Sequence, residues 1–376
     1  MTKRVGNIWL PVMVFTMIQA CENKGTVTHF DWQQLQQLPD AVGFAGAYAG
    51  VSNGHLLVAG GANFPEGTRP WSGGVKQWSD QVFVFKADAG EWERAGSLPR
   101  PMGYGVSVVW RDSLIIIGGS DRARHYADVF AITYTEGELK TSAWPSLPAP
   151  LANTCGALVG DVIYVAGGLS SPIDTTASNG FFALDLSKPA AERRWETLES
   201  WPGAPRMLAV AGAMGDGFYL LSGVSLSVNP GDSLPTRTYL VDAFRYEPQV
   251  GWTEIADLPH AVAAAPSPAF TTRNDEVLVF GGDDGRLAPQ AGALKDRHPG
   301  FSTDILAYDL ATDSWRVDGK LPVDKLANPE NDPNASTWAP VTTTGVVWND
   351  HYILPMGEVR PGVRTNRVLA VKCEAK

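Results

Sequence analysis

Residues 56–61 read LLVAGG, a short apolar strand that runs into two glycines, and this arrangement returns five more times along the chain. The further copies are LIIIGG at 114–119, IYVAGG at 163–168, YLLSG at 219–223, VLVFGG at 277–282 and YILPMG at 352–357. Successive copies end between 49 and 75 residues apart. A self-similar unit of about this length is typical of one blade of a β-propeller.

A second element of the repeat is a tryptophan that precedes a Leu-Pro or Trp-Pro pair. The six tryptophans in this position are Trp32, Trp92, Trp144, Trp195, Trp252 and Trp315. We interpret them as core residues that pack between neighbouring blades, because a row of sugar-stacking aromatics would not need such regular spacing.

The order of these two repeat elements along the chain predicts how the blades of the propeller close into a ring. Trp32 has no double glycine before it, and Gly357 has no tryptophan after it. We therefore expect the segment around Val27–Leu38 to supply the outer strand of the blade whose other strands come from Val341–Val371. The sequence predicts an all-β fold: a six-bladed kelch-type β-propeller over 27–376, closed by N- and C-terminal strands in one blade.

The first residues have the features of an export signal. Lys3 and Arg4 are followed by an apolar stretch from Ile8 to Ile18, which is too short for a stable membrane span. The IQAC segment ending at Cys21 resembles a bacterial lipobox. We expect a signal peptide over 1–20, a tether over 21–26 and lipidation at Cys21, in a periplasmic or outer-membrane-anchored protein; cleavage without lipid is the alternative.

Composition excludes several classes of function. The formal net charge of −10 argues against a nucleic-acid partner. There is no CxxC or HExxH, and the six histidines are scattered, so we expect neither a metal nor another cofactor. Cys155 lies in an apolar run and is predicted to be a core thiol, while the spacing to Cys373 does not require a disulfide.

Three segments look like long loops, and we expect them to cover a channel mouth: Asn63–Asp80, Asp283–Gly300 and Pro322–Thr337.

The last copy of the repeat, MGEVRPGVRTN at 356–366, contains the most unusual chemistry. Pro361-Gly362 is a turn signal, so Glu358 and Arg364 should flank a tight turn and face each other. One interpretation is a structural salt bridge. The other is an acid/base carboxylate beside an arginine that binds an anion.

The GEVRPGVRTN segment, preceded by STWAPVTTTGVVWNDHYIL at 336–354, resembles the bacterial N-acetylneuraminate epimerases, the sialic acid mutarotases with a six-bladed propeller. Residues 97–119 and 200–223 resemble two further blades of that family. The blade order is rotated, which is similar to the cyclically permuted branch. The resemblance implies that Glu358 is the proton acceptor and that Arg364, six residues later, is its catalytic partner. It also implies a sugar acid as substrate.

Further candidates for binding the sugar acid lie in other loops. Arg100 and Arg206 follow Leu-Pro or Trp-Pro turns just before the next blade, where an arginine either touches ligand or ties blades together. Tyr104, Asn63 and Arg69 are weaker candidates.

Three classes of function remain to be weighed. The first is an isomerase that interconverts anomers of N-acetylneuraminate by acid/base catalysis. The second is a non-catalytic propeller that binds a glycan or protein partner at the cell envelope. A sialidase or a copper oxidase is disfavoured, because the Ser-x-Asp-x-Gly-x-x-x-Trp box and a Cys/Tyr/His set are not found.

Overall fold

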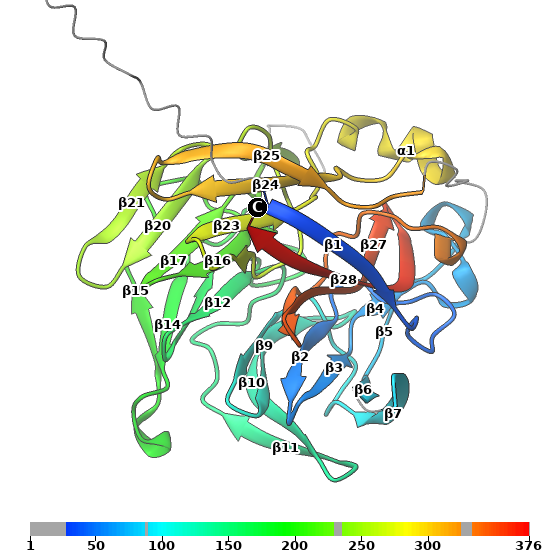
Figure 1. Cartoon of the computed structure of the whole chain (residues 1–376), viewed down its shortest axis with the longest axis horizontal. Helices are drawn as coiled ribbons and strands as arrows, with labels where there is room; N and C mark the ends of the chain where they lie inside the picture. The colour runs from blue at the N-terminus through cyan, green and yellow to red at the C-terminus, as the bar shows by residue number, and fades with distance from the viewer. Residues whose placement is uncertain (1–27, 87–88, 229–234, 325–332, 376) are drawn as a thin grey trace, which may run out of the picture.

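The computed structural model describes residues 28–86, 89–228, 235–324 and 333–375. Within these residues, six four-stranded antiparallel sheets are arranged around a central channel as the blades of a β-propeller (Figure 1). The predicted fold class is therefore confirmed. The expected signal peptide, tether and Cys21 lie outside the described residues.

The blades are numbered in chain order. Blade 1 contains β2 (Tyr48–Ser52), β3 (His55–Ala59), β6 (Gln81–Lys86) and β7 (Glu91–Ser97). Blade 2 contains β8 (Val106–Trp110), β9 (Ser113–Ser120), β10 (His125–Thr135) and β11 (Glu138–Trp144). Blade 3 contains β12 (Cys155–Val159), β13 (Val162–Ala166), β14 (Phe181–Asp185) and β15 (Trp195–Leu198).

The second half of the ring repeats this arrangement. Blade 4 contains β16 (Val210–Met214), β17 (Gly217–Leu221), β20 (Ala243–Glu247) and β21 (Gly251–Ile255). Blade 5 contains β22 (Phe270–Thr271), β23 (Glu276–Phe280), β24 (Asp304–Asp309) and β25 (Ser314–Lys320). Blade 6 contains β26 (Val346–Trp348), β27 (His351–Arg360), β28 (Val363–Ala375) and β1 (Thr28–Leu35).

Short elements lie in the connections. Two hairpins pair β4 (Ala62–Asn63) with β5 (Gln77–Trp78) and β18 (Val224–Ser227) with β19 (Thr236–Tyr239). The one α-helix among the described residues is α1 (Ala291–Leu294), and 3-10 turns span Pro65–Gly67, Pro70–Ser72, Ala190–Glu192, Ala288–Gln290, Lys295–Arg297 and Pro333–Ala335. In the described part of the chain, none of the helices has the length and apolar character needed to cross a membrane.

Blade 6 closes the ring with both ends of the chain, as predicted. β1 pairs antiparallel with β28, from Thr28 opposite Ala375 to Leu35 opposite Val368. The two strands lie side by side in Figure 1, β1 in blue and β28 in red. Pairing β1 with β28 covers the outer edge of β28 and ties the N-terminal strand to the C-terminal one.

The repeated pair follows the second strand in four blades and lies within β9 and β27 in the other two, with the same unusual backbone conformation throughout. The first residue of each pair has a φ between 54° and 67°, including Ser222 and Met356, and the second, always glycine, has a φ between 88° and 130°. At Gly119 a Cβ atom would lie 2.0 Å from the hydroxyl of Tyr48. The second position therefore requires glycine, whereas the first tolerates a side chain.

The predicted tryptophan positions connect neighbouring blades. The indole N–H groups of four of them donate to backbone carbonyls just past the outer strand of the preceding blade: Trp92 to Gln36, Trp195 to Pro145, Trp252 to Glu199 and Trp315 to Ala256. Apolar clusters lie around these contacts, such as the one between blades 6 and 1 that contains Phe85, Trp92 and Trp348. The interpretation of the repeat tryptophans as core residues is confirmed for these four.

The channel is bounded by a closed chain of backbone hydrogen bonds, which we call the inner ring. Its members, one per blade just before the innermost strand, all have a φ between 53° and 67°: Gly46, Tyr104, Asn153, Leu208, Ala264 and Thr342. Each amide donates to the carbonyl of the preceding member, and Gly46 donates to Thr342, at 2.7 or 2.8 Å. The inner ring thus fixes the relative position of all six blades around the axis.

Candidate active site at the channel mouth

The hairpin between β27 and β28 places Glu358 opposite Arg364. The two residues are cross-strand partners, and Pro361-Gly362 forms the turn between them. The amide of Gly362 donates to Glu358 Oε1 at 2.6 Å, and Arg364 Nη1 lies 3.4 Å from the same oxygen. The predicted tight turn and facing pair are therefore present. The turn amide holds one carboxylate oxygen in place, and the side chain remains 20% exposed.

Arg364 is a buried cation, and only one of its three guanidinium nitrogens makes a hydrogen bond to a described residue. Its side chain is 4% exposed and lies over the ring of Phe64, with Nη2 3.5 Å from the hydroxyl of Tyr104. Burial would lower the pKa of Arg364, but the negative charge of Glu358 and the hydroxyl of Tyr104 raise it above its usual value. Nε and Nη1 find no hydrogen-bond acceptor among the described residues. Such orphaned buried donors are rare in proteins and mark a place where a ligand can supply the acceptor.

Glu358 also lines a cavity of about 240 Å³ between blades 4, 5 and 6. The polar side chains on its other walls come from the β18–β19 hairpin and from the loop that follows β23: Arg237, Tyr239, Asp283 and His298. The hydroxyl of Tyr239 donates to Asp283 Oδ2 at 2.8 Å. Burial, and then the charge of Asp283, raise the pKa of Tyr239 to about 12, so this phenol keeps its proton.

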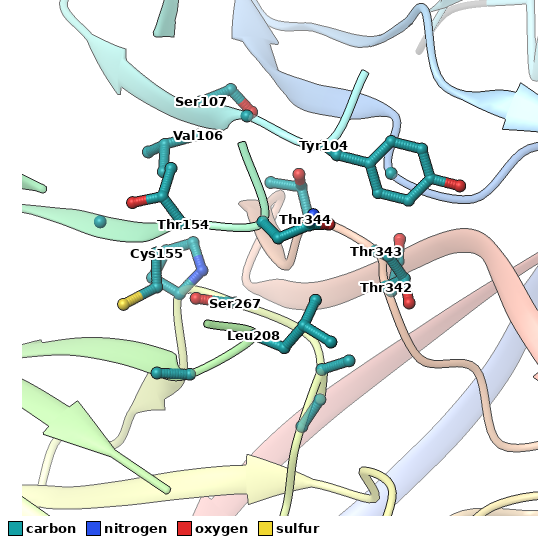
Figure 2. Close-up of a pocket in the computed structure, with 18 of the residues that line it drawn as sticks. Tyr104, Val106, Ser107, Thr154, Cys155, Leu208, Ser267, Thr342, Thr343 and Thr344 are labelled. Carbon is teal, nitrogen blue, oxygen red and sulfur yellow. The ribbon is translucent and has the colours of Figure 1, made fainter. Parts of the chain in front are cut away.

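Deeper in the molecule the channel becomes narrow. It encloses about 70 Å³, lined by all six residues of the inner ring and by hydroxyl side chains from several blades (Figure 2). These hydroxyls are bonded to backbone carbonyls: Thr343 to Pro355, Thr344 to Ala47 and Ser107 to Ala49. They hold neighbouring strands together, and the space between them is too small for a sugar. Along the channel, a ligand of that size fits at the mouth and not in the bore.

Two of the predicted loops meet beside the Glu358–Arg364 hairpin. Asp296, in the 283–300 loop, accepts from Arg69 Nε at 3.3 Å and from Trp71 Nε1 at 3.1 Å, both in the 63–80 loop. The backbone carbonyl of Asp296 accepts from Arg360 Nη1 at 2.7 Å. Pro70 and Trp71 also lie against Gly362 in the turn. The loops therefore support the turn that carries the carboxylate.

The third predicted loop is described only in part, because residues 325–332 lie outside the described residues. In the remainder, Asn334 Oδ1 accepts from Thr365 Oγ1 at 2.9 Å and from the Asn366 amide at 2.8 Å. This segment braces β28 just after Arg364.

Arg206 and Arg100 are not brought to the hairpin. Arg206 is fully buried, with both terminal nitrogens on the carboxylate of Asp242 and further bonds to the carbonyls of Ala204 and Ser222. Arg100 is half-exposed and binds Asp128 at 2.9 Å. Neither residue lines the cavity at Glu358. Each ties the loop entering a blade to an aspartate at the third strand of that blade, which is the structural alternative considered from the sequence.

The weaker candidates are distributed around the pair. Tyr104 belongs to the inner ring, touches Arg364 and is covered by Lys76, whose Nζ lies 4.0 Å from its ring centre. Asn63 is buried, with Nδ2 3.5 Å from Asp40 Oδ1, and it precedes the Phe64 that supports Arg364. Arg69 binds Asp296 and has a supporting place in the loop contact.

Sequence reasoning did not identify Asp283, the second acidic residue that lines the Glu358 cavity, although the repeat contained a signal for it. Asp283 follows Gly281-Gly282 in the same way that Glu358 follows Met356-Gly357. The two residues form equivalent antiparallel bridges, Asp283 with Ala263 and Glu358 with Val341. In the other four blades this position is Ala62, Ser120, Leu169 or Val224. Comparing the residue after each stop would have identified two acids in adjacent blades.

The described residues contain no group of three or more His, Cys, Asp or Glu side chains able to hold a metal ion. Cys155 is a buried free thiol, as predicted, and burial raises its pKa to about 12; Cys373 is also free.

Comparison with solved structures supports the fold. The chain described as "Structure of YjhT" superposes with a TM-score of 0.62 and 16% sequence identity, covering 90% of this chain and 99% of that one. At this level of identity the likeness shows a shared architecture.

Comparison of sequences identifies the family. The N-acetylneuraminate epimerase of Haemophilus influenzae strain 86-028NP is 29% identical over 255 residues, which are 62% of this chain and 60% of the relative. The corresponding protein of Salmonella typhimurium strain LT2 is 35% identical over 123 residues, 29% of this chain and 31% of the relative. The matched segments thus span about a third to three fifths of the curated relatives. A family model for N-acetylneuraminate epimerase matches residues 18–141 and 144–287, more than half of the chain. The chain belongs to the N-acetylneuraminate epimerase family.

Proposed function

We propose that this protein interconverts the anomers of N-acetylneuraminate, with Glu358 as the group that moves the proton. The observation that carries the proposal is the buried Arg364, which is charged and has two nitrogens without a hydrogen bond to a described residue, next to a partly exposed carboxylate at the channel mouth. Family membership and the names of the relatives support the same reaction and substrate. The family match ends at residue 287, so the assignment of the hairpin depends on its own geometry and motif.

Mutarotation requires a proton to leave one oxygen of the anomeric carbon and another oxygen to gain it. Glu358 accepts the proton of the anomeric hydroxyl while the bond between the anomeric carbon and the ring oxygen breaks. The electron pair of that bond goes to the ring oxygen, which then takes the proton from Glu358. Rotation about the adjacent carbon–carbon bond and the reverse steps close the ring on the other face. General acid–base catalysis of this kind contributes about 10²–10⁴-fold.

Arg364 has the chemistry to bind the carboxylate of the sugar acid. A guanidinium presents parallel N–H groups that match a carboxylate, and charge-assisted bonds of this type are stronger than neutral ones. Nε and Nη1 make no hydrogen bond with a described residue, although Nη1 also lies 3.4 Å from Glu358 Oε1. Because Glu358 Oε1 lies 3.4 Å from Nη1, we infer that the bound anion and the catalytic carboxylate share one cation. In this proposal the anomeric carbon, which carries the substrate carboxylate, lies within reach of Glu358.

We further propose that the protein acts outside the cytoplasm, attached through Cys21 or released by cleavage. The basic start, the apolar stretch and the IQAC segment support this location. In that setting the enzyme would equilibrate sugar acid set free outside the cell before uptake. Labelling with a fatty-acid analogue, compared between the natural chain and Cys21→Ser, tests the lipid anchor; label on both or on neither contradicts it.

The activity is tested by one-dimensional proton NMR of anomeric exchange. α-N-acetylneuraminate is released in place by a sialidase, and the approach to the β-rich equilibrium is followed with and without protein. The natural protein should accelerate exchange, and Glu358→Gln should lower the rate by at least about 100-fold, since the amide keeps the shape but cannot accept the proton.

A matched control is Glu247→Gln, because Glu247 pairs with Arg245 on the third strand of blade 4, away from the hairpin. It should exchange the sugar at the natural rate. Full activity in Glu358→Gln would remove Glu358 from the mechanism. If the natural protein gives no acceleration over buffer, the epimerase proposal fails, and binding of a glycan or protein partner becomes the better description.

A further inference from the structure

His298 is a buried imidazole on the wall of the Glu358 cavity that the proposed mechanism does not use. It lies in the loop between β23 and β24 and is 3% exposed. His298 lines the same cavity of about 240 Å³ as Glu358 and Pro361 of the hairpin. Phe301 lies against it, with ring centres 5.9 Å apart, and helps to fix its orientation.

The hydrogen bond made by His298 determines where its proton is. The amide of Gly300 donates to Nδ1 at 3.2 Å, so Nδ1 presents a lone pair and the ring proton is on Nε2. Nε2 makes no hydrogen bond with any described residue. His298 lines the Glu358 cavity, and it also lines two neighbouring pockets together with Gly300 and Phe301. The ring therefore has one nitrogen committed to its own loop and one N–H available to a ligand.

The charged groups around His298 keep it in this neutral form. Burial lowers its pKa, the carboxylates of Asp283 and Asp284 oppose this effect, and the guanidinium of Arg360 reinforces it. A second ring proton would also face the Gly300 amide and break the Nδ1 bond. At neutral pH the ring is a fixed, uncharged hydrogen-bond donor.

We propose that Nε2–H of His298 donates a hydrogen bond to the ring oxygen of the bound sugar acid and stabilises the charge that develops there. This inference rests on the proposed epimerase function and adds His298 to Glu358 and Arg364 as a catalytic residue. As the bond between the anomeric carbon and the ring oxygen breaks, the electron pair moves to the ring oxygen. Glu358 supplies the proton that neutralises it, and His298 keeps its own. A preorganised donor aimed at a developing charge typically contributes about 10²–10³-fold to kcat.

Two substitutions separate this role from a structural one. Asparagine places a carbonyl oxygen near the position of Nδ1, so His298→Asn can keep the Gly300 contact but loses the cavity donor. Glutamine places an amide N–H near the position of Nε2, so His298→Gln keeps the donor and loses the loop contact. We expect kcat for exchange to fall about 100-fold in His298→Asn, with KM and the melting temperature close to the natural values. His298→Gln should keep most of the activity, with a lower melting temperature.

The opposite order, a fully active His298→Asn and an impaired His298→Gln, would show that the ring only supports its loop and would overturn the proposal. If His298→Gln does not fold, the rate and melting temperature of His298→Asn decide the question alone. The control His351→Gln removes an imidazole at the start of β27 whose bonds are to Gln33 and to the carbonyl of Asn349. It should leave the rate unchanged.

The same variants distinguish failure of this inference from failure of the proposed function. If the natural protein accelerates exchange and His298→Asn does so equally well, the function stands and His298 has no part in it. If the natural protein does not accelerate exchange, the epimerase function fails, and the role of His298 in it is overturned as well.

Discussion

The guanidinium groups of Arg206 and Arg364 are both buried, yet only Arg206 has acceptors for all three of its nitrogens. Arg206 binds Asp242 and two backbone carbonyls, while two nitrogens of Arg364 have no acceptor among the described residues. This difference separates a cation that holds a loop from the one that we propose binds the carboxylate of the sugar acid.

The sequence alone could not make this distinction. Arg206 and Arg100 occupy the loop position expected near the channel, but their partners Asp242 and Asp128 come from later in the same blades. Only the register of the third strand brings each aspartate to its arginine. By contrast, Glu358 and Arg364 are six residues apart across a Pro-Gly turn, so local geometry sufficed to pair them.

A first prediction at this scale concerns Asp242→Asn. The change leaves the buried guanidinium of Arg206 without its counter-charge, and removing one partner of such a pair is strongly destabilising. Because Asp242 is 26% exposed, we expect a loss of about 3 kcal/mol in the free energy of unfolding, measured by urea denaturation. The folded variant should exchange sugar at the natural rate. A loss below about 0.5 kcal/mol, the range of ordinary surface changes, would contradict the role given to this pair.

At the scale of single elements, the stop after each second strand was the most predictable feature. A run of apolar residues followed by two glycines identified all six copies, including the variants with Ser222 and Met356. The hairpins β4–β5 and β18–β19 were not predicted, because their paired segments of two to four residues are too short for an alternating pattern to stand out. The second of these hairpins carries Tyr239, so part of the cavity wall was missed with it.

The requirement for glycine at the second position of the stop is tested by Gly119→Ala. The new Cβ would meet the hydroxyl of Tyr48 at 2.0 Å and the carbonyl of Gly103 at 2.8 Å. Gly137, in the β10–β11 turn, has a φ of 85° and open space around its Cβ position, so Gly137→Ala measures the conformational cost alone. We expect Gly137→Ala to cost about 1 kcal/mol and Gly119→Ala at least about 3 kcal/mol in thermal or urea unfolding. Equal costs would mean that the close approach to Tyr48 is unimportant.

For the whole molecule, acid should weaken the fold through buried histidines. Burial lowers the pKa of both His125 and His298 below the usual 6.5. The unfolded chain therefore binds protons more readily than the native state. The stabilising contribution of the two neutral histidines is present above about pH 6.5 and is lost as the pH falls through their lower native pKa values. Stability should thus decline between pH 7.5 and pH 5.5.

His125→Asn tests this expectation, since its amide can still donate to the carbonyl of Leu169 that His125 Nδ1 contacts at 3.0 Å. The variant should lose less stability than the natural protein over this pH interval in urea titrations. An identical decline would show that His125 does not contribute to the acid sensitivity.

The six backbone links of the inner ring also decide how molecules can travel. Because every link is 2.7 or 2.8 Å long and the bore encloses only about 70 Å³, the axis offers no passage to something as large as a sugar. A ligand that reaches Glu358 from the mouth must therefore leave on the same side of the propeller. In the reaction that we propose, both anomers enter and leave on this side, so the protein equilibrates them without carrying sugar across the ring.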